Sequence, residues 1–143
     1  FFGYADRLED VAGVTRVVDY KTGVTTQTDL NLKADWDIDG GKLDKGNASK
    51  ALQLLVYCAI LLNDESLQEV KASIRSGRNA HSGLLNLKIG KRTEINRGDI
   101  DMLIEWISNK LSNFKEDGRE ISHNEDSKYC EYCVVLDPPV ISY

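Results

Sequence analysis

The stretch RVVDYKTG, residues 16–23, has the pattern of a buried strand that ends in charged side chains. Two valines are followed by Asp19 and Lys21, and Gly23 indicates a turn. Side chains at positions i and i+2 of a strand point to the same face, so the carboxylate and the ammonium are expected to project into one site. A carboxylate can hold a hard divalent cation, and a lysine beside it can polarise a phosphate. A surface ion pair fits the same short pattern, because such motifs carry a high risk of false matches.

Composition and charge limit the class of protein. The chain has 143 residues, of which 41% are hydrophobic, enough for a single domain over 1–143. No apolar run reaches membrane-spanning length, so no membrane partner is expected. Three cysteines do not make a disulfide framework, which favours a reducing, cytoplasmic setting. The net charge of −5 gives no broad basic surface, so nucleic-acid binding would have to be local or helped by metal ions. Because the sequence opens on the strand-like FFGYAD, we expect a domain trimmed from a longer protein.

Local patterns predict both strands and helices. Four segments have strand-like sequence: 1–8, 14–21, 69–76 and 81–89. Two segments have apolar residues at helical spacing: 47–64, which Asn47 can cap, and 97–116, which Gly118 can end. The polar residues 24–46 predict a loop or insertion, and 119–143 predict an irregular tail. The order strand, strand, helix, strand, strand, helix indicates a mixed α/β fold.

Further polar residues are expected near the end of the second predicted strand. If the first two strands pair as a hairpin, Asp6 can lie beside Asp19. Two carboxylates and a lysine at strand ends suit metal-assisted hydrolysis of a phosphodiester. Gln53 and Tyr57 are four residues apart, share one helix face, and are costly to bury without polar partners. A phosphate, a metal-bound water or Lys21 would supply one, although boundary residues satisfied by water fit the same pattern.

The combination of motifs resembles a known family. In order along the chain come Gly3, Asp6-Arg7, a second strand that ends in DYKTG at 19–23, and QLLVY at 53–57. This order resembles the RecB-like nucleases of the PD-(D/E)XK superfamily, whose pattern is a glycine before Asp-Arg, then D-Y-K-T-G, then a helix with Q-x-x-x-Y. No single piece is specific, but the combination is, and it spans residues 3 to 57.

The resemblance implies a fold, an activity and a site. The implied fold is the restriction-endonuclease-like mixed sheet flanked by helices, here without the helix that precedes the first strand in the family. The implied activity is cleavage of DNA with Mg²⁺ or Mn²⁺, as the nuclease module of a repair or recombination protein with a helicase region or subunit. The implied site residues are Asp6, Asp19 and the Tyr20 backbone carbonyl for the metal, Lys21 for catalysis, and Gln53 and Tyr57 from the helix.

The cysteines fit the family only in part. Members with an iron–sulfur cluster use one upstream cysteine and three near the C-terminus, and Cys130 and Cys133 resemble the first two of those three. The third does not follow, so no complete cluster is expected in this chain. Zinc held by this pair and His123 is an alternative with only three ligands, and Cys58 has the setting of a small core residue.

Two rival functions stay open at this stage. A CRISPR-associated nuclease of the same superfamily shares these motifs. A non-catalytic DNA-binding or scaffold module could keep the fold, although such a module has no chemical need for Lys21 beside two acids.

Two other patterns have plainer interpretations. The segment 35–46 begins like a calcium loop, but Gly46 stands where a bidentate glutamate is needed, so a solvated loop is favoured. Six cations could form a local basic edge for a DNA backbone, or simply a solvated face: Arg75, Arg78, Lys88, Lys91, Arg92 and Arg97.

Overall fold

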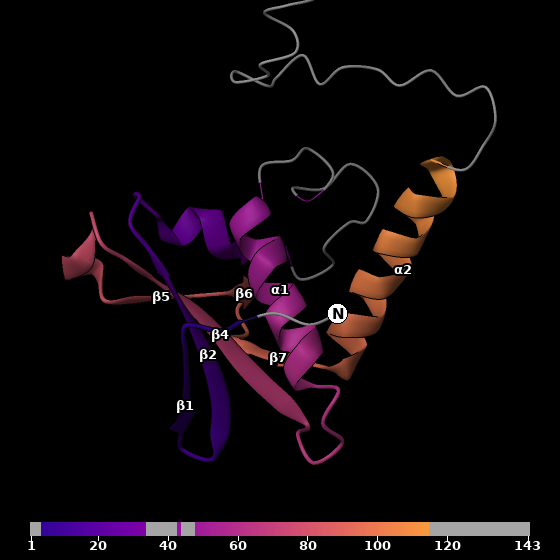
Figure 1. The fold of residues 1–143 in the computed structure, drawn as a ribbon, viewed down its shortest axis with the longest axis horizontal. Coiled ribbons are helices and arrows are strands. Elements are labelled where there is room, and N and C mark those ends of the chain that lie inside the picture. Colours follow the sequence, from indigo (N-terminus) through magenta and orange to yellow (C-terminus); the bar gives the residue numbers. More distant parts are fainter. Residues whose placement is uncertain (1–3, 34–42, 44–47, 115–143) are drawn as a thin grey trace, which may run out of the picture.

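The computed structural model describes residues 4–33, 43 and 48–114 (Figure 1). Their elements are, in chain order, β1 (Arg7–Val11), β2 (Val14–Lys21), the 3₁₀ helix η1 (Gln27–Leu30), β3 (Asn31–Leu32), α1 (Ser49–Leu61), β4 (Glu69–Ser76), η2 (Ala80–Ser82), β5 (Leu84–Asn86), β6 (Lys88–Ile89), β7 (Glu94–Asn96) and α2 (Arg97–Phe114). This arrangement confirms the predicted mixed α/β fold. The predicted irregular tail 119–143 lies outside the described residues, as does the predicted solvated loop 35–46 except for residue 43.

The main sheet is built around β2 and β4. β1 and β2 form an antiparallel hairpin, and Gly13 in its turn has a φ of 81°, a conformation that glycine adopts readily. β4 runs parallel to β2, with Lys21 opposite Ser76. A parallel pair needs a long crossover connection, and α1 lies within that connection. β5 and β7 are antiparallel to β4, so the described part of this sheet has five strands.

The helices cover the sheet on the side that becomes the core. α1 packs on β2 and β4, and α2 packs beside α1 and against β7 (Figure 1). Side chains alternate along a strand, so Val17, Asp19 and Lys21 share the face that α1 covers. Val17 is 1% exposed and joins the apolar core, together with buried side chains of the neighbouring elements such as Leu54, Leu55, Ala72, Ile74 and Leu103. The two charged residues follow at the edge of this core.

The first strand and the first helix differ from the sequence prediction at their ends. Among the described residues β1 begins at Arg7, so Asp6 precedes the strand instead of lying within it. α1 begins at Ser49 after Ala48, which makes no side-chain cap bond, and Asn47 lies outside the described residues. Both ends depend on tertiary pairing and packing, which override local propensity.

The prediction of one strand over 81–89 is wrong. The chain there forms η2, β5 and β6, because Gly83 turns with a φ of 69° and β6 leaves the main sheet to pair with β3. The two-residue alternation nevertheless persists, and its buried members are Leu85, Leu87 and Ile89. β7, which the sequence did not predict, extends the main sheet.

The predicted second helix is confirmed over Arg97–Phe114. Asn96 caps it: the Asp99 amide donates to Asn96 Oδ1 at 3.2 Å, and the Asn96 amide donates to Asp99 Oδ2 at 2.9 Å. Neither described helix has the length and apolar character needed to cross a bilayer.

Candidate active site

The end of β2 places a carboxylate and an ammonium together under α1, as the sequence predicted. Asp19 is 5% exposed, whereas the Lys21 side chain is 30% exposed and reaches solvent. Their heads meet with Lys21 Nζ 2.9 Å from Asp19 Oδ2. A buried carboxylate is costly unless a cation or hydrogen bonds compensate it, so this pair is the electrostatic centre of the site.

α1 contributes the two polar residues predicted to face this pair. Lys21 Nζ donates a hydrogen bond to Gln53 Oε1 at 2.7 Å. The Gln53 Nε2 donates to Tyr57 Oη at 3.0 Å and to Asp19 Oδ1 at 3.3 Å. The amide therefore joins the lysine, the carboxylate and the phenol in one network. Because the Tyr57 oxygen accepts from Gln53, its own proton is left to donate to another group.

Asp6 lies next to this network but is oriented differently from Asp19. Its Oδ2 accepts a hydrogen bond from the Tyr20 amide at 2.8 Å, and its side chain is exposed. The register of β1 and β2, with Arg7 opposite Val18, carries Asp6 to the position beside Asp19. The N–H and C=O of one extended residue point to the same side of a strand, so the Tyr20 carbonyl also faces this edge.

One atom of the site has no hydrogen-bond partner. Asp19 Oδ2 is fully buried and accepts no geometrically well-formed hydrogen bond in the described structure, and its contact is the 2.9 Å ion pair with Lys21 Nζ. A buried carboxylate oxygen without such a bond fits a ligand for a hard cation. The described residues contain no group of three or more His, Cys, Asp or Glu side chains that could hold a metal. The oxygens that could hold a cation here are those of Asp6, Asp19 and the Tyr20 carbonyl, a small set of the kind that Mg²⁺ accepts because that ion keeps several waters.

β4 holds the backbone of Lys21 from the other side. The Gly77 amide donates to the Lys21 carbonyl at 2.7 Å. The fully buried Ser76 hydroxyl donates to the Gly23 carbonyl at 2.8 Å and accepts from the Thr25 amide at 3.3 Å. Sequence reasoning missed these residues, because a serine and a glycine at a strand end occur in many turns and carry no specific signal.

Cys58, the cysteine that the described residues include, makes no contact with this network. Cys58 is fully buried, and burial raises the pKa of its thiol to about 12. It is a core residue of α1, as predicted, and it is unsuited to metal binding or nucleophilic attack. Cys130, Cys133 and His123 lie outside the described residues.

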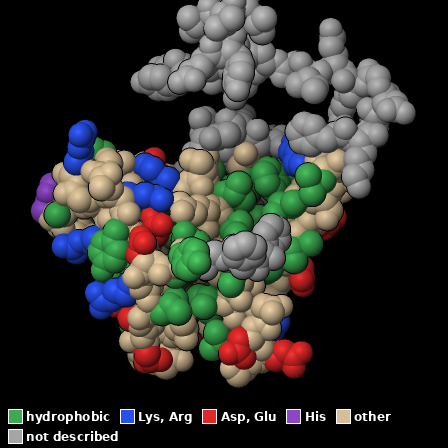
Figure 2. Space-filling view, in the orientation of Figure 1, with side chains coloured by type: hydrophobic (Ala, Val, Ile, Leu, Met, Phe, Trp, Pro, Cys, Tyr) green, Lys and Arg blue, Asp and Glu red, His purple; other side chains and the backbone are tan. Residues whose placement is uncertain are grey.

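Two of the six cations in the predicted basic edge are held by other groups of the protein and are not free to bind a DNA backbone. Arg92 is committed to Asp99 through contacts of 2.8 and 3.2 Å, which raise the pKa of its guanidinium. Arg97 donates to the backbone carbonyls of Asp64 and Leu67. In the space-filling view most visible Lys and Arg side chains lie on the side of η2 and β5, whereas hydrophobic side chains gather toward α1 and α2 (Figure 2).

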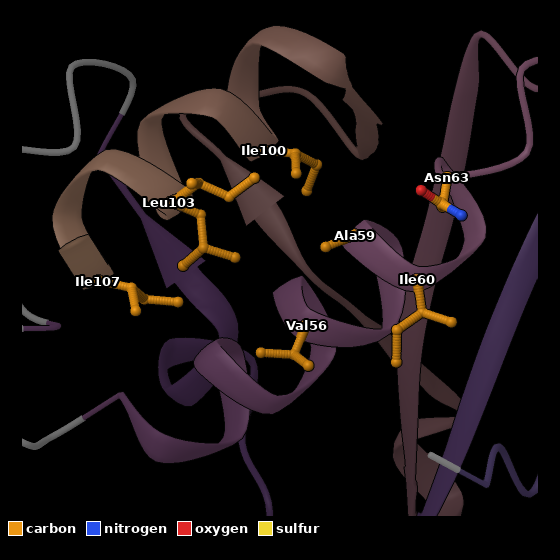
Figure 3. Close-up of a pocket in the computed structure, with 8 residues that line it drawn as sticks. Val56, Ala59, Ile60, Asn63, Ile100, Leu103 and Ile107 are labelled. Carbon is orange, nitrogen blue, oxygen red and sulfur yellow. The ribbon is translucent and has the colours of Figure 1, made fainter. Parts of the chain in front are cut away.

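A separate cavity of about 260 Å³ lies between α1 and α2. Figure 3 shows its lining, with Val56, Ala59 and Ile60 from α1 facing Leu103 and Ile107 from α2. Apart from Asn63, the lining side chains are aliphatic, so this cavity offers no groups for hydrolytic chemistry.

Comparison with known families identifies the class of protein. The family model described as the PD-(D/E)XK nuclease superfamily matches residues 1–137. Searches among curated proteins and among solved structures gave no match. The match covers nearly the whole chain, and the chain belongs to the PD-(D/E)XK nuclease superfamily.

Proposed function

We propose that this chain is a single metal-dependent nuclease domain that hydrolyses phosphodiester bonds of DNA. The observation that carries the proposal is the network at the end of β2, where Lys21 contacts both Asp19 and Gln53. Membership of a nuclease superfamily supports it, and the network residues are the ones on which the resemblance in the sequence rests. A structural ion pair would not need a glutamine and a tyrosine that complete its hydrogen bonds from a helix.

Mg²⁺ or Mn²⁺ would be held by Asp6, Asp19 and the Tyr20 carbonyl. When bound there, the ion would activate a water molecule and neutralise charge on the phosphate. The buried Asp19 carboxylate supports this assignment, since its Oδ2 is held only by the ion pair with Lys21 and a hard cation prefers such an oxygen. The solvent-facing position of Asp6 leaves room for the waters that Mg²⁺ retains.

The protein side chains would act on the phosphate and on the attacking water. Lys21 is fixed by Asp19 and Gln53 but reaches solvent, so its ammonium can stabilise the negative charge that develops in the transition state. Gln53 orients the lysine. Tyr57, which accepts from Gln53, can donate its proton to a phosphate oxygen.

The cellular setting that we propose rests on the motif order and, for the cytoplasm, on the cysteine content. The RecB-like order favours a nuclease module in DNA repair or recombination, acting with a helicase region or subunit in the cytoplasm. A CRISPR-associated nuclease of the same superfamily is the alternative, and the two differ in the proteins with which the chain would associate.

The activity is tested by incubating the chain with end-labelled duplex DNA, single-stranded DNA and RNA of one sequence. We expect cleavage of DNA with Mg²⁺ or Mn²⁺ and none with EDTA, because the proposed cation at Asp6 and Asp19 would activate the attacking water. Cleavage that persists in EDTA would contradict the metal dependence. Cleavage of RNA alone would contradict the DNA assignment.

A further inference from the structure

The loop 77–83, which joins β4 to β5, lies directly beside the candidate site. It begins after Ser76, the register partner of Lys21, and it includes η2. Figure 1 shows it at the end of the β4–β5 hairpin, on the side away from α2. Its second residue, Arg78, is exposed. The loop therefore presents a cation next to the strand end that carries Lys21.

The base of this loop is tied to the backbone of the site. Gly77, immediately before Arg78, donates its amide proton to the Lys21 carbonyl at 2.7 Å. Beyond Arg78, the Asn79 amide donates to the Ser76 hydroxyl at 3.2 Å, and the Asn79 side chain reaches the Thr25 carbonyl at 3.5 Å. Arg78 thus has a fixed backbone on both sides, and its position relative to Lys21 is set by hydrogen bonds.

Arg78 has no partner among the described residues, a property that it shares with Lys33, Arg75, Lys88 and Lys91 but that it alone combines with a place in the loop tied to Lys21. Acidic partners occupy the following cations: Arg7, Arg16, Lys21, Lys50, Lys71 and Arg92. Arg97 is bonded to two backbone carbonyls. Within the described residues Arg78 makes no ion pair or hydrogen bond, so its five N–H donors are open to solvent.

We propose that the loop 77–83 is the part of the surface that binds the DNA backbone, with Arg78 on a phosphate adjacent to the one that is cut. The inference rests on the proposed function and adds to it a substrate contact outside the catalytic network. Phosphates recur every ~3.4 Å along the axis of each DNA strand, so a cation tethered at Lys21 can meet a neighbouring phosphate. Guanidinium binds phosphate in a bidentate manner, which would fix the register of the strand at the site.

The test measures DNA binding in a Lys21→Ala background, where the substrate should stay intact. A fluorescein-labelled duplex is titrated at several salt concentrations with the Lys21→Ala parent. The same titration is made with three double variants, in which the parent also carries Arg78→Gln, Arg78→Lys or Lys71→Gln. Lys71→Gln is the matched control: it removes the same charge from β4, but that charge is already paired with Glu94 at 3.0 Å. We expect Arg78→Gln to raise the Kd about three- to tenfold and to lower the salt slope by about 0.9.

The other variants are expected to behave differently. Arg78→Lys should keep the salt slope of the parent, and Lys71→Gln should change the Kd less than about twofold. Equal effects of Arg78→Gln and Lys71→Gln, while the wild-type chain cleaves DNA, would overturn the loop assignment and leave the nuclease assignment standing. A wild-type chain that cleaves nothing, combined with a specific loss of binding in Arg78→Gln, would overturn the nuclease assignment and keep the loop as a DNA contact.

Discussion

Replacing Lys21 with alanine is expected to reduce DNA cleavage by on the order of a hundredfold or more, without unfolding the domain. The Lys21 side chain is 30% exposed at a strand end, so its removal opens no core cavity. The substitution leaves the buried Asp19 carboxylate without its ion-pair partner, however, so we expect a lower melting temperature in a domain that stays folded. The lysine ammonium would act mainly where negative charge develops on the phosphate, so its removal should lower the rate of the cleavage step itself. DNA binding should persist, because it depends on many backbone contacts.

This expectation is checked by single-turnover cleavage and a thermal melt of each variant. Lys21→Arg should not restore activity, because a planar guanidinium cannot replace a compact ammonium between Asp19 and Gln53. Lys71→Ala serves as the control, since that lysine is paired with Glu94 near the start of β4. A Lys21→Ala protein that stays folded and cuts at the wild-type rate would contradict the assignment of the nuclease site to this lysine.

Replacing Asp19 with asparagine is expected to reduce both cation binding and cleavage. An amide keeps the size of the side chain but removes the charge that a hard cation needs at the buried Oδ2. We expect Mn²⁺ affinity to fall about tenfold or more and the cleavage rate on the order of a hundredfold. The melting temperature should change little, because Lys21 reaches solvent and keeps its bond to Gln53.

Titration calorimetry with Mn²⁺ measures the binding part of this prediction. Asp101→Asn is the matched control, because Asp101 is exposed on α2 outside the network. The control should bind Mn²⁺ as the wild type does. Equal Mn²⁺ binding by wild-type and Asp19→Asn proteins would remove the metal from this residue.

The central part of the candidate site could be predicted from sequence because its spacing is local. Asp19 and Lys21 share a strand face through the two-residue period, and Gln53 and Tyr57 share a helix face through the four-residue period. Both predictions agree with the hydrogen bonds of the structure. The mixed α/β fold followed from the order of such segments.

Features that depend on distant pairing could not be predicted in this way. The hydrogen bonds of Ser76 to the loop after β2 join residues about fifty positions apart. The ion pair between Arg92 and Asp99 forms because of where α2 begins relative to β7. The sequence analysis therefore counted Arg92 among the cations available to DNA, although Asp99 neutralises it. The break in the predicted strand 81–89 depends on β6 pairing with β3, which no local pattern indicates.

The central claim is that the cation required for DNA cleavage is held at Asp19, beside Lys21. It is tested most directly by adding Mn²⁺ to the isotopically labelled chain and following the paramagnetic broadening of backbone amide signals. We expect the signals of residues 6 and 19–21 to broaden first, and this broadening to be lost in Asp19→Asn. Broadening that begins elsewhere, such as within the acidic segment 35–46, or that is unchanged in Asp19→Asn, would contradict the claim.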